Sequence, residues 1–161
     1  MDNTQEIRIE PALDIHAESC ARISLQVYVH IHEVYAQRLG QELHDDLMGD
    51  WEEKKAESVI NQIGKGQSFV ALVGDRVVGF AGYRLDGQCG VISNNAVDPE
   101  FRGRGIAGLL YAKCLEEMRK AGMKYARVHT GLDDAHAPAR RAYEKAGFQK
   151  NLPSVMYYQE L

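Results

Sequence analysis

The stretch Val97-Asp98-Pro99-Glu100-Phe101-Arg102-Gly103-Arg104-Gly105-Ile106-Ala107-Gly108 carries most of the information about the fold. Its first residue ends a run of β-forming residues, and Pro99 stops the strand because proline has no N–H for the ladder. Glycines and two arginines follow, and then an apolar helix begins. Small residues, main-chain N–H groups and the positive end of a helix together suit a bound diphosphate. The stretch therefore predicts a pyrophosphate-binding turn between a strand and a helix.

The same glycines allow two other interpretations. Gly103, Gly105 and Gly108 also spell G-x-G-x-x-G, the pattern of dinucleotide-binding folds. That fold requires an acidic residue on the next strand and a second βαβ half. Residues 124–130 contain no Asp or Glu, and the chain ends 58 residues after Gly103, so we reject a nicotinamide enzyme. The remaining alternative is a basic turn that only caps a core helix.

Hydrophobic periodicity outside this stretch predicts one mixed α/β domain over residues 1–161. No repeat or Pro/Gly/Ser-rich linker divides the chain. The expected order is β-α-α-β-β-β-α-β-α-β-β. The expected elements are a strand at 7–11, a helical region from 14 that Gly40 and Gly49 interrupt, a helix at 51–63, strands at 68–73, 76–85 and 91–97, a helix from 106 that Ala121-Gly122 ends, a strand at 125–130, a helix at 138–146 and a final β segment at 148–159.

Composition excludes several classes of protein. Nineteen Lys and Arg against 23 Asp and Glu give a formal charge of −4, which argues against non-specific nucleic-acid binding. Cys20, Cys89 and Cys114 have neither C-x-x-C nor C-x-x-H spacing, so no disulfide framework or metal site is expected. The chain shows no signal-peptide pattern and no apolar stretch of about 20 residues, so we expect a cytoplasmic protein without a membrane partner.

A second motif follows the predicted diphosphate turn. Residues 139–148 read A-R-R-A-Y-E-K-A-G-F, and residues 102–107 read R-G-R-G-I-A. The two segments resemble the A-x-x-x-Y-x-x-x-G-F and Q/R-x-x-G-x-G/A signatures of the GNAT superfamily of N-acetyltransferases, and the resemblance covers residues 68–161 well. It implies a mostly antiparallel, V-splayed sheet flanked by helices, acetyl-CoA as cosubstrate, no metal, and a homodimer.

The resemblance also implies roles for individual residues. The Asn95 N–H would contact the thioester carbonyl oxygen, Val97 would contact the pantetheine amides, and Tyr143 would be the general acid beside the sulfur. The alternative for Tyr143 is a core residue on the buried face of its helix. The implied coenzyme-binding residues are Asn95, Val97, Arg102, Gly103, Arg104, Gly105, Ile106, Ala107, His136, Ala139 and Tyr143.

The sequence departs from the family pattern in two places. His136 stands where many relatives carry asparagine, which puts the usual amide contact in doubt. The strand residues Ser93-Asn94-Asn95 include no glutamate that could accept the amine proton. We place a proton relay at His129, with Glu33 and His32 behind it; the alternative is a structural histidine.

These features predict an N-acetyltransferase that transfers the acetyl group of acetyl-CoA to an amine of a small molecule or a protein. The alternative is a coenzyme A-binding regulator that transfers no acyl group. An acidic stretch would favour a cationic amine, although a solvated helical face is the simpler interpretation. Its members are Glu42, Asp45, Asp46 and Asp50. Tyr157 and Tyr158 could line the pocket or an interface.

Overall fold

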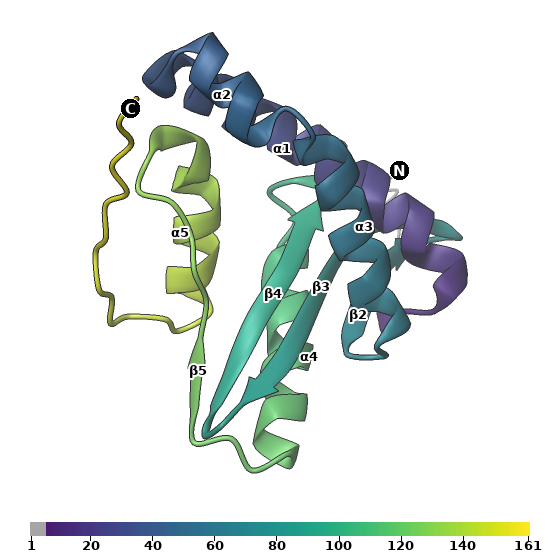
Figure 1. The fold of residues 1–161 in the computed structure, drawn as a ribbon. Coiled ribbons are helices and arrows are strands. Elements are labelled where there is room, and N and C mark those ends of the chain that lie inside the picture. Colours follow the sequence, from purple (N-terminus) through teal and green to yellow (C-terminus); the bar gives the residue numbers. More distant parts are fainter. Residues whose placement is uncertain (1–5) are drawn as a thin grey trace.

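The structure is a computed structural model that describes residues 6–161 (Figure 1). Its helices and strands are β1 (Ile7–Pro11), α1 (Ala17–Leu39), α2 (Gln41–Met48), α3 (Trp51–Gly64), β2 (Ser68–Val73), β3 (Arg76–Asp86), β4 (Cys89–Val97), α4 (Ile106–Lys120), β5 (Tyr125–Arg127) and α5 (Ala137–Lys145). Short 3-10 helices, η1 (Asp14–His16), η2 (Pro99–Phe101) and η3 (Asp134–His136), precede α1, α4 and α5.

The five strands form one open sheet in the order β1-β2-β3-β4-β5. The first four strands pair antiparallel with their neighbours, and β5 pairs parallel to β4. This arrangement confirms the predicted mixed α/β fold with a mostly antiparallel sheet.

Helices cover both faces of the sheet, with α1 and α3 on one face and α4 on the other (Figure 1). The alternation of side chains along β2 shows how the strand serves two cores. Val70 and Leu72 pack with α1 and α3, whereas Ala71 and Val73 pack with α4. Because both faces are covered, this strand is a nearly continuous apolar run, as its sequence suggested.

The long helical region breaks where the sequence predicted. Gly40 has φ 87°, a left-handed value that favours glycine, and it separates α1 from α2. Gly49 then separates α2 from α3. The helix expected at 138–146 is α5, displaced by one residue.

The last part of the chain differs from the prediction. Residues 148–159 were expected to form a β segment, but no strand follows α5, and Figure 1 draws this part as an extended yellow trace. The strand expected at 125–130 ends at Arg127. A β-forming sequence becomes a strand only when a neighbour accepts its hydrogen bonds, and Pro153 lacks one donor. Periodicity alone does not show whether that neighbour is present.

Candidate active site

A β-bulge in β4 sets the direction of the main chain at the site. Between the pairs Ala81–Asn95 and Tyr83–Ile92, two residues of β4, Ser93 and Asn94, face the single residue Gly82 of β3. Beyond the bulge the antiparallel ladder is regular, and the Asp98 N–H donates to Val78 O over 2.9 Å. Since hydrogen-bonding direction alternates along a strand, the N–H and C=O groups of Asn95 and Val97 point away from β3.

The edge to which these groups point is open. β5 pairs with β4 only at Cys89, Gly90 and Val91, and then the two strands separate. In residues 6–161, no strand pairs with β4 beyond Val91 on that side. The expected V-shaped splay is therefore present, and a cleft of about 1470 Å³ lies along it.

A glycine turn closes one end of this cleft. After η2, Gly103 and Gly105 adopt φ 77° and 76°, and α4 begins directly after Gly105. A Cβ atom at either glycine would meet nothing within 4 Å, so the space above the turn is open. The first turn of α4 has no acidic residue and no side-chain cap. Its N–H groups are thus available to an anion.

Phe101 fixes the position of the turn. The guanidinium carbons of Arg76 and Arg104 lie 4.9 and 4.7 Å from the centre of its ring. Arg104 therefore packs on Phe101 and is not among the residues that line the cleft, whereas Arg102, Gly103 and Gly105 line it. Of the two arginines predicted to contact the diphosphate, Arg102 therefore lines the cleft and Arg104 does not.

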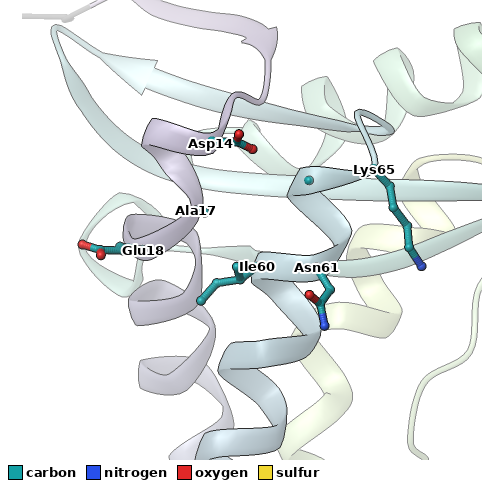
Figure 2. A pocket seen from close by; sticks show the side chains of 7 residues that line it. Asp14, Ala17, Glu18, Ile60, Asn61 and Lys65 are labelled. Carbon is teal, nitrogen blue, oxygen red and sulfur yellow. The ribbon is translucent and has the colours of Figure 1, made fainter.

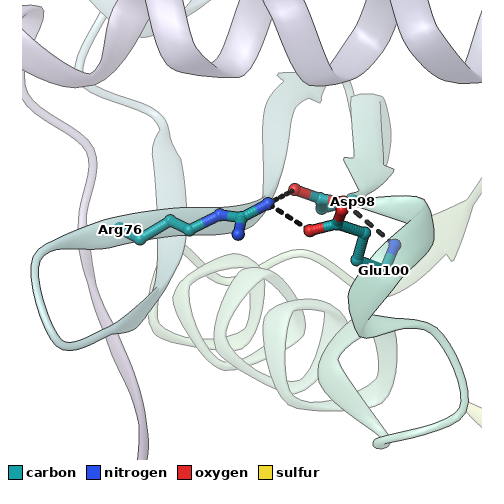
Figure 3. A network of polar contacts seen from close by, with 3 residues as sticks. All are labelled: Arg76, Asp98 and Glu100. Atoms are coloured by element: carbon teal, nitrogen blue, oxygen red, sulfur yellow. Dashed lines mark hydrogen bonds and ion pairs between the residues drawn. The ribbon is translucent and has the colours of Figure 1, made fainter.

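An ion-pair network ties the turn to the sheet (Figure 3). Arg76, at the start of β3, reaches Asp98 Oδ2 over 2.8 Å and Glu100 Oε2 over 2.7 Å. Asp98 is buried, and its Oδ1 accepts the N–H of Glu100 at 3.0 Å. The carboxylate thus caps η2 and binds the neighbouring strand at the same time.

On the α4 and α5 side of β4, Asn95 joins two phenols. Its Nδ2 donates to Ser93 O at 2.8 Å and to the Tyr143 hydroxyl at 3.1 Å, and the Tyr111 hydroxyl donates to its Oδ1 at 2.7 Å. The two tyrosine rings are 5.2 Å apart, and both side chains are buried. Burial raises the pKa of Tyr143, so its phenol keeps its proton at neutral pH.

On the α1 and α3 side, Asn94 has a different set of partners. Lys55 Nζ donates to its Oδ1 at 2.7 Å, and its Nδ2 donates to Ser58 Oγ at 2.9 Å. The amide of Gln62 accepts the Asn94 N–H at 2.8 Å and donates to its carbonyl at 3.0 Å. Gln62 therefore satisfies the main-chain groups that the bulge removes from the ladder.

The wall formed by the segment before α5 contains a histidine–carboxylate pair. His136 Nδ1 lies 2.8 Å from Asp133 Oδ2, and both side chains are largely buried. Arg140 Nη1 donates to the carbonyls of Gly131 and Asp133, each at 2.7 Å, which holds this loop in place. The His136 ring also faces that of Tyr35 on α1, with their centres 6.3 Å apart.

The structure brings most of the predicted site residues to one cleft. Among the cleft-lining residues are Asn95, Val97, Arg102, Gly103, Gly105, Ile106, Ala107, His129, His136, Ala139 and Tyr143. His129 is exposed there. The two residues expected behind it do not line the cleft: His32 stacks on Trp51 at 4.2 Å, and Glu33 lies 3.3 Å from His30 Nδ1. Burial, with His44 and Lys55 nearby, lowers the pKa of His32 to about 4.

The predicted acidic stretch does not reach the cleft. Asp45 accepts hydrogen bonds from Gln41 and His44, and Asp50 pairs with Lys54 at 2.8 Å. Tyr157, in the C-terminal segment, is 90% exposed and does not line the cleft either.

A second, smaller hollow lies between the first turn of α1 and the end of α3 (Figure 2). It measures about 700 Å³, and Asp14, Glu18, Asn61 and Lys65 line it. No arginine or tyrosine is among its lining residues. Within the described range 6–161, no group of three His, Cys, Asp or Glu side chains could hold a metal ion. The helices of this range are too short or too polar to cross a membrane.

Comparisons with known proteins agree with this geometry. The model of the Acetyltransferase (GNAT) family matches residues 20–148, and the chain therefore belongs to the GNAT family of acetyltransferases. Mycothiol acetyltransferase of Thermobispora bispora is 35% identical to this chain over 72 residues. That match covers 45% of this chain and 24% of the relative, so it spans about a quarter of the relative's length.

Solved structures share the fold at low sequence identity. The PaiA N-acetyltransferase of Thermoplasma acidophilum, solved with coenzyme A, has a TM-score of 0.71 at 18% identity, over 89% of this chain and 90% of that one. The aminoglycoside N-acetyltransferase AAC(6')-Iy, solved with a bisubstrate analogue, has a TM-score of 0.66 at 15% identity, over 97% of this chain and 99% of that one. Ribosomal-protein-alanine N-acetyltransferase of Brucella melitensis has a TM-score of 0.63 at 15% identity, over 96% of this chain and 100% of that one.

Proposed function

We propose that this chain is an N-acetyltransferase that transfers the acetyl group of acetyl-CoA to an amine of a small molecule or a protein. One observation carries the proposal: a single cleft joins the glycine turn at the start of α4, the open edge of β4 and the Tyr143 hydroxyl. An acyl transfer requires an anchored donor, a polarised carbonyl and a proton for the leaving thiolate, and these three features supply them in order.

The turn fits the diphosphate of the coenzyme. The open space above Gly103 and Gly105 allows close approach, and the unpaired N–H groups of the first turn of α4 are suitable donors. Arg102 lines the cleft and would supply the opposing charge. Ala139 and His136 lie on the opposite wall, where they would contact the pantetheine arm.

The residues around Asn95 would perform the transfer. When bound, acetyl-CoA supplies a thioester whose carbonyl carbon can accept the lone pair of an amine. The Asn95 N–H would polarise the carbonyl oxygen. As the C–N bond forms and the C–S bond breaks, Tyr143 would give its proton to the sulfur and recover one from solvent. The proton of the amine would leave through His129 or water.

The release of free thiol from acetyl-CoA in the presence of an amine panel tests the transferase directly. Gly105→Ala should weaken acetyl-CoA binding at least about tenfold, because a side chain is strained at φ 76° and the turn must shift. Gly122→Ala is the matched control, since Gly122 has φ 78° and lies at the far end of α4. Coenzyme binding without amine-dependent thiol release would instead favour a regulator that binds coenzyme A.

We also propose a homodimer. The segment after α5 supports it, because Leu152, Val155, Met156 and Tyr157 are each more than 70% exposed. Apolar side chains grouped in this way commonly mark an interface. Light scattering coupled to size-exclusion chromatography should give twice the chain mass of 18.0 kDa. A mass of one chain at micromolar concentration would contradict the dimer.

A further inference from the structure

The charge of the cleft is one-sided. Arg102, Arg119, Arg141 and Lys145 line it, together with three histidines. Within residues 6–161, no Asp or Glu is among the lining residues. The smaller hollow of Figure 2 shows the opposite tendency, because Asp14 and Glu18 line it. The cleft therefore offers a cationic ligand no carboxylate to pair with.

Two carboxylates contact histidines that line the cleft. Asp133 is 2.8 Å from His136 Nδ1, and its main-chain and side-chain oxygens also hold the loop before α5. Glu33 is 3.3 Å from the exposed ring of His30. Neither carboxylate is itself among the lining residues, so a polyamine or another polycation would find no carboxylate from residues 6–161 in the lining of the cleft.

Lys55, on α3, adds a cation directly behind two of the cleft-lining residues, although it is not itself among the lining residues. Its ammonium lies 3.7 Å from the centre of the Tyr28 ring and 2.7 Å from Asn94 Oδ1, and both Tyr28 and Asn94 line the cleft. Lys55, Ser58 and Gln62 follow each other at intervals of three and four along α3, so all three face the bulge of β4.

This lysine has no charged partner in the part of the chain that the structure describes, since none of its carboxylates lies within 4 Å of Lys55 Nζ. Burial lowers the pKa of Lys55 to about 8, which leaves the side chain mostly charged at pH 7. An ammonium has three donors, and the amide and the aromatic ring occupy two of them. A partly buried cation without a counter-ion is costly, and a ligand carboxylate would offset that cost.

We propose, on the basis of the transferase function above, that the acceptor is an amine that also carries a carboxylate, and that Lys55 supplies the charge that selects it. The one-sided charge of the cleft has a second consequence for the same acceptor. Nearby cations disfavour the protonated form of an amine, so the surroundings that attract the carboxylate also favour the neutral nucleophile. This accounts for a transferase whose β4 strand contains no carboxylate base.

Matched acceptors test this proposal. Thiol release from acetyl-CoA is measured with free amino acids, with ω-amino acids such as β-alanine, with the corresponding amides, and with spermidine. We expect kcat/KM to be at least about tenfold higher for the acids than for their amides. The amine of an amino-acid amide has a lower pKa than the amine of the free acid, so a larger fraction of it is neutral at pH 7. A preference for the acid therefore cannot come from amine protonation.

Three variants assign the preference to Lys55. Lys55→Met, which keeps most of the length of the side chain, should lower kcat/KM for the acids at least about tenfold more than it lowers kcat/KM for the amides, with little change in the KM for acetyl-CoA. Lys55→Arg should keep the preference. Lys54→Met is the control on the same helix, because Lys54 is exposed and pairs with Asp50.

The outcomes separate the two proposals. Faster transfer to amides or to spermidine than to any acid would overturn this inference and leave the transferase standing. An acid preference that survives in a folded Lys55→Met variant would overturn the role of Lys55. Absence of thiol release with every acceptor would overturn the transferase, and this inference with it.

Discussion

Asn94 and Asn95 are neighbours in the chain, but their side chains lie on opposite faces of β4 and have opposite chemical surroundings. The Asn95 side chain donates to the Tyr143 hydroxyl and accepts from the Tyr111 hydroxyl. Asn94 joins Lys55 and Ser58 on α3. Under the proposed function, one strand would contribute both to the transfer step and to the choice of acceptor, because the amide of Asn95 contacts a phenol on one face and the amide of Asn94 contacts an ammonium on the other.

The largest effect on activity should come from the face of β4 on which Asn95 contacts Tyr111 and Tyr143. Tyr143→Phe removes the proton for the leaving thiolate, and we expect turnover to fall at least about tenfold. The affinity for acetyl-CoA should stay nearly the same, because the ring remains in its packed position. Steady-state kinetics and a thermal-shift titration measure the two quantities separately. Tyr125→Phe is the control, since Tyr125 is 59% exposed on β5. Unchanged turnover in Tyr143→Phe would refute the assignment.

A substitution on the opposite face of β4, where Asn94 contacts Lys55 and Ser58, should mainly alter stability and acceptor selectivity. Asn94→Ala leaves Lys55 Nζ and Ser58 Oγ without their acceptor and donor, which we expect to lower the free energy of unfolding by about 1–3 kcal/mol. The preference for acids over amides should shrink because the ammonium is no longer held at the cleft wall. Chemical denaturation and the acceptor panel measure both effects. Asn61→Ala, on the exposed face of α3, should change neither; equal losses in the two variants would contradict the role of Asn94.

A change of pH should reveal the charge of Lys55. The pKa of Lys55 is lowered to about 8, so its charge is lost as pH rises through that value. Titration of the acceptor amines also changes the ratio of kcat/KM for an acid to that for its amide, but it does so equally in every variant. At pH 9.5 the ratio should therefore be several-fold smaller in the wild type than in Lys55→Arg, and at pH 7 the two ratios should be similar, because arginine stays charged. Equal ratios in the two proteins at both pH values would contradict the role of the Lys55 charge.

The lowered pKa of Lys55 also makes the stability of the fold depend on pH. The unfolded chain holds the Lys55 proton up to about pH 10.5, whereas the folded chain releases it near pH 8. Between these values the unfolded state binds more protons, so this residue makes stability rise with pH. Denaturation of the wild-type chain and of Lys55→Met at several pH values measures the contribution as a difference.

The smallest effect on acceptor preference is expected at Arg76, which pairs with residues just after β4. Arg76→Gln removes a half-exposed guanidinium from the buried Asp98 and the exposed Glu100. Because a buried carboxylate that loses its partner is destabilising, we expect the melting temperature to fall by about 2–4 °C and the acid preference to stay constant. Differential scanning fluorimetry and the acceptor panel suffice. A change in acceptor preference in this variant would mean that the two faces are not independent.

Local patterns predicted most of the fold and most of the residues that line the cleft. The glycine turn, the strand before it and the position of Tyr143 depend on residues close together in the chain, and the structure brings them to one cleft. The prediction of a β segment at 148–159 was wrong because strand formation depends on a partner that is distant in the chain. His32 and Glu33, expected behind His129, are not among the cleft-lining residues, since the rotation of a long helix decides which side chains reach the cleft.

The contacts between α3 and Asn94 of β4 could not be predicted from the sequence. Lys55, Ser58 and Gln62 have the spacing of one helix face, but Val59 and Ile63 mark the adjacent face as apolar, and nothing in the chain indicates which strand it meets. The bulge at Ser93 and Asn94 appears only in the strand register. The pairing of Asp133 with His136 is the exception, because residues three apart before a helix often form such a pair.

The centre of the Phe101 ring lies 4.9 and 4.7 Å from the guanidinium carbons of Arg76 and Arg104, and this packing bears on the speed of the proposed coenzyme binding. A glycine-rich loop that had to become ordered around its ligand would spend part of the binding free energy on its own ordering. A turn that the aromatic ring already holds in place would avoid this cost. Encounter and orientation, rather than loop rearrangement, would then limit the rate of coenzyme association.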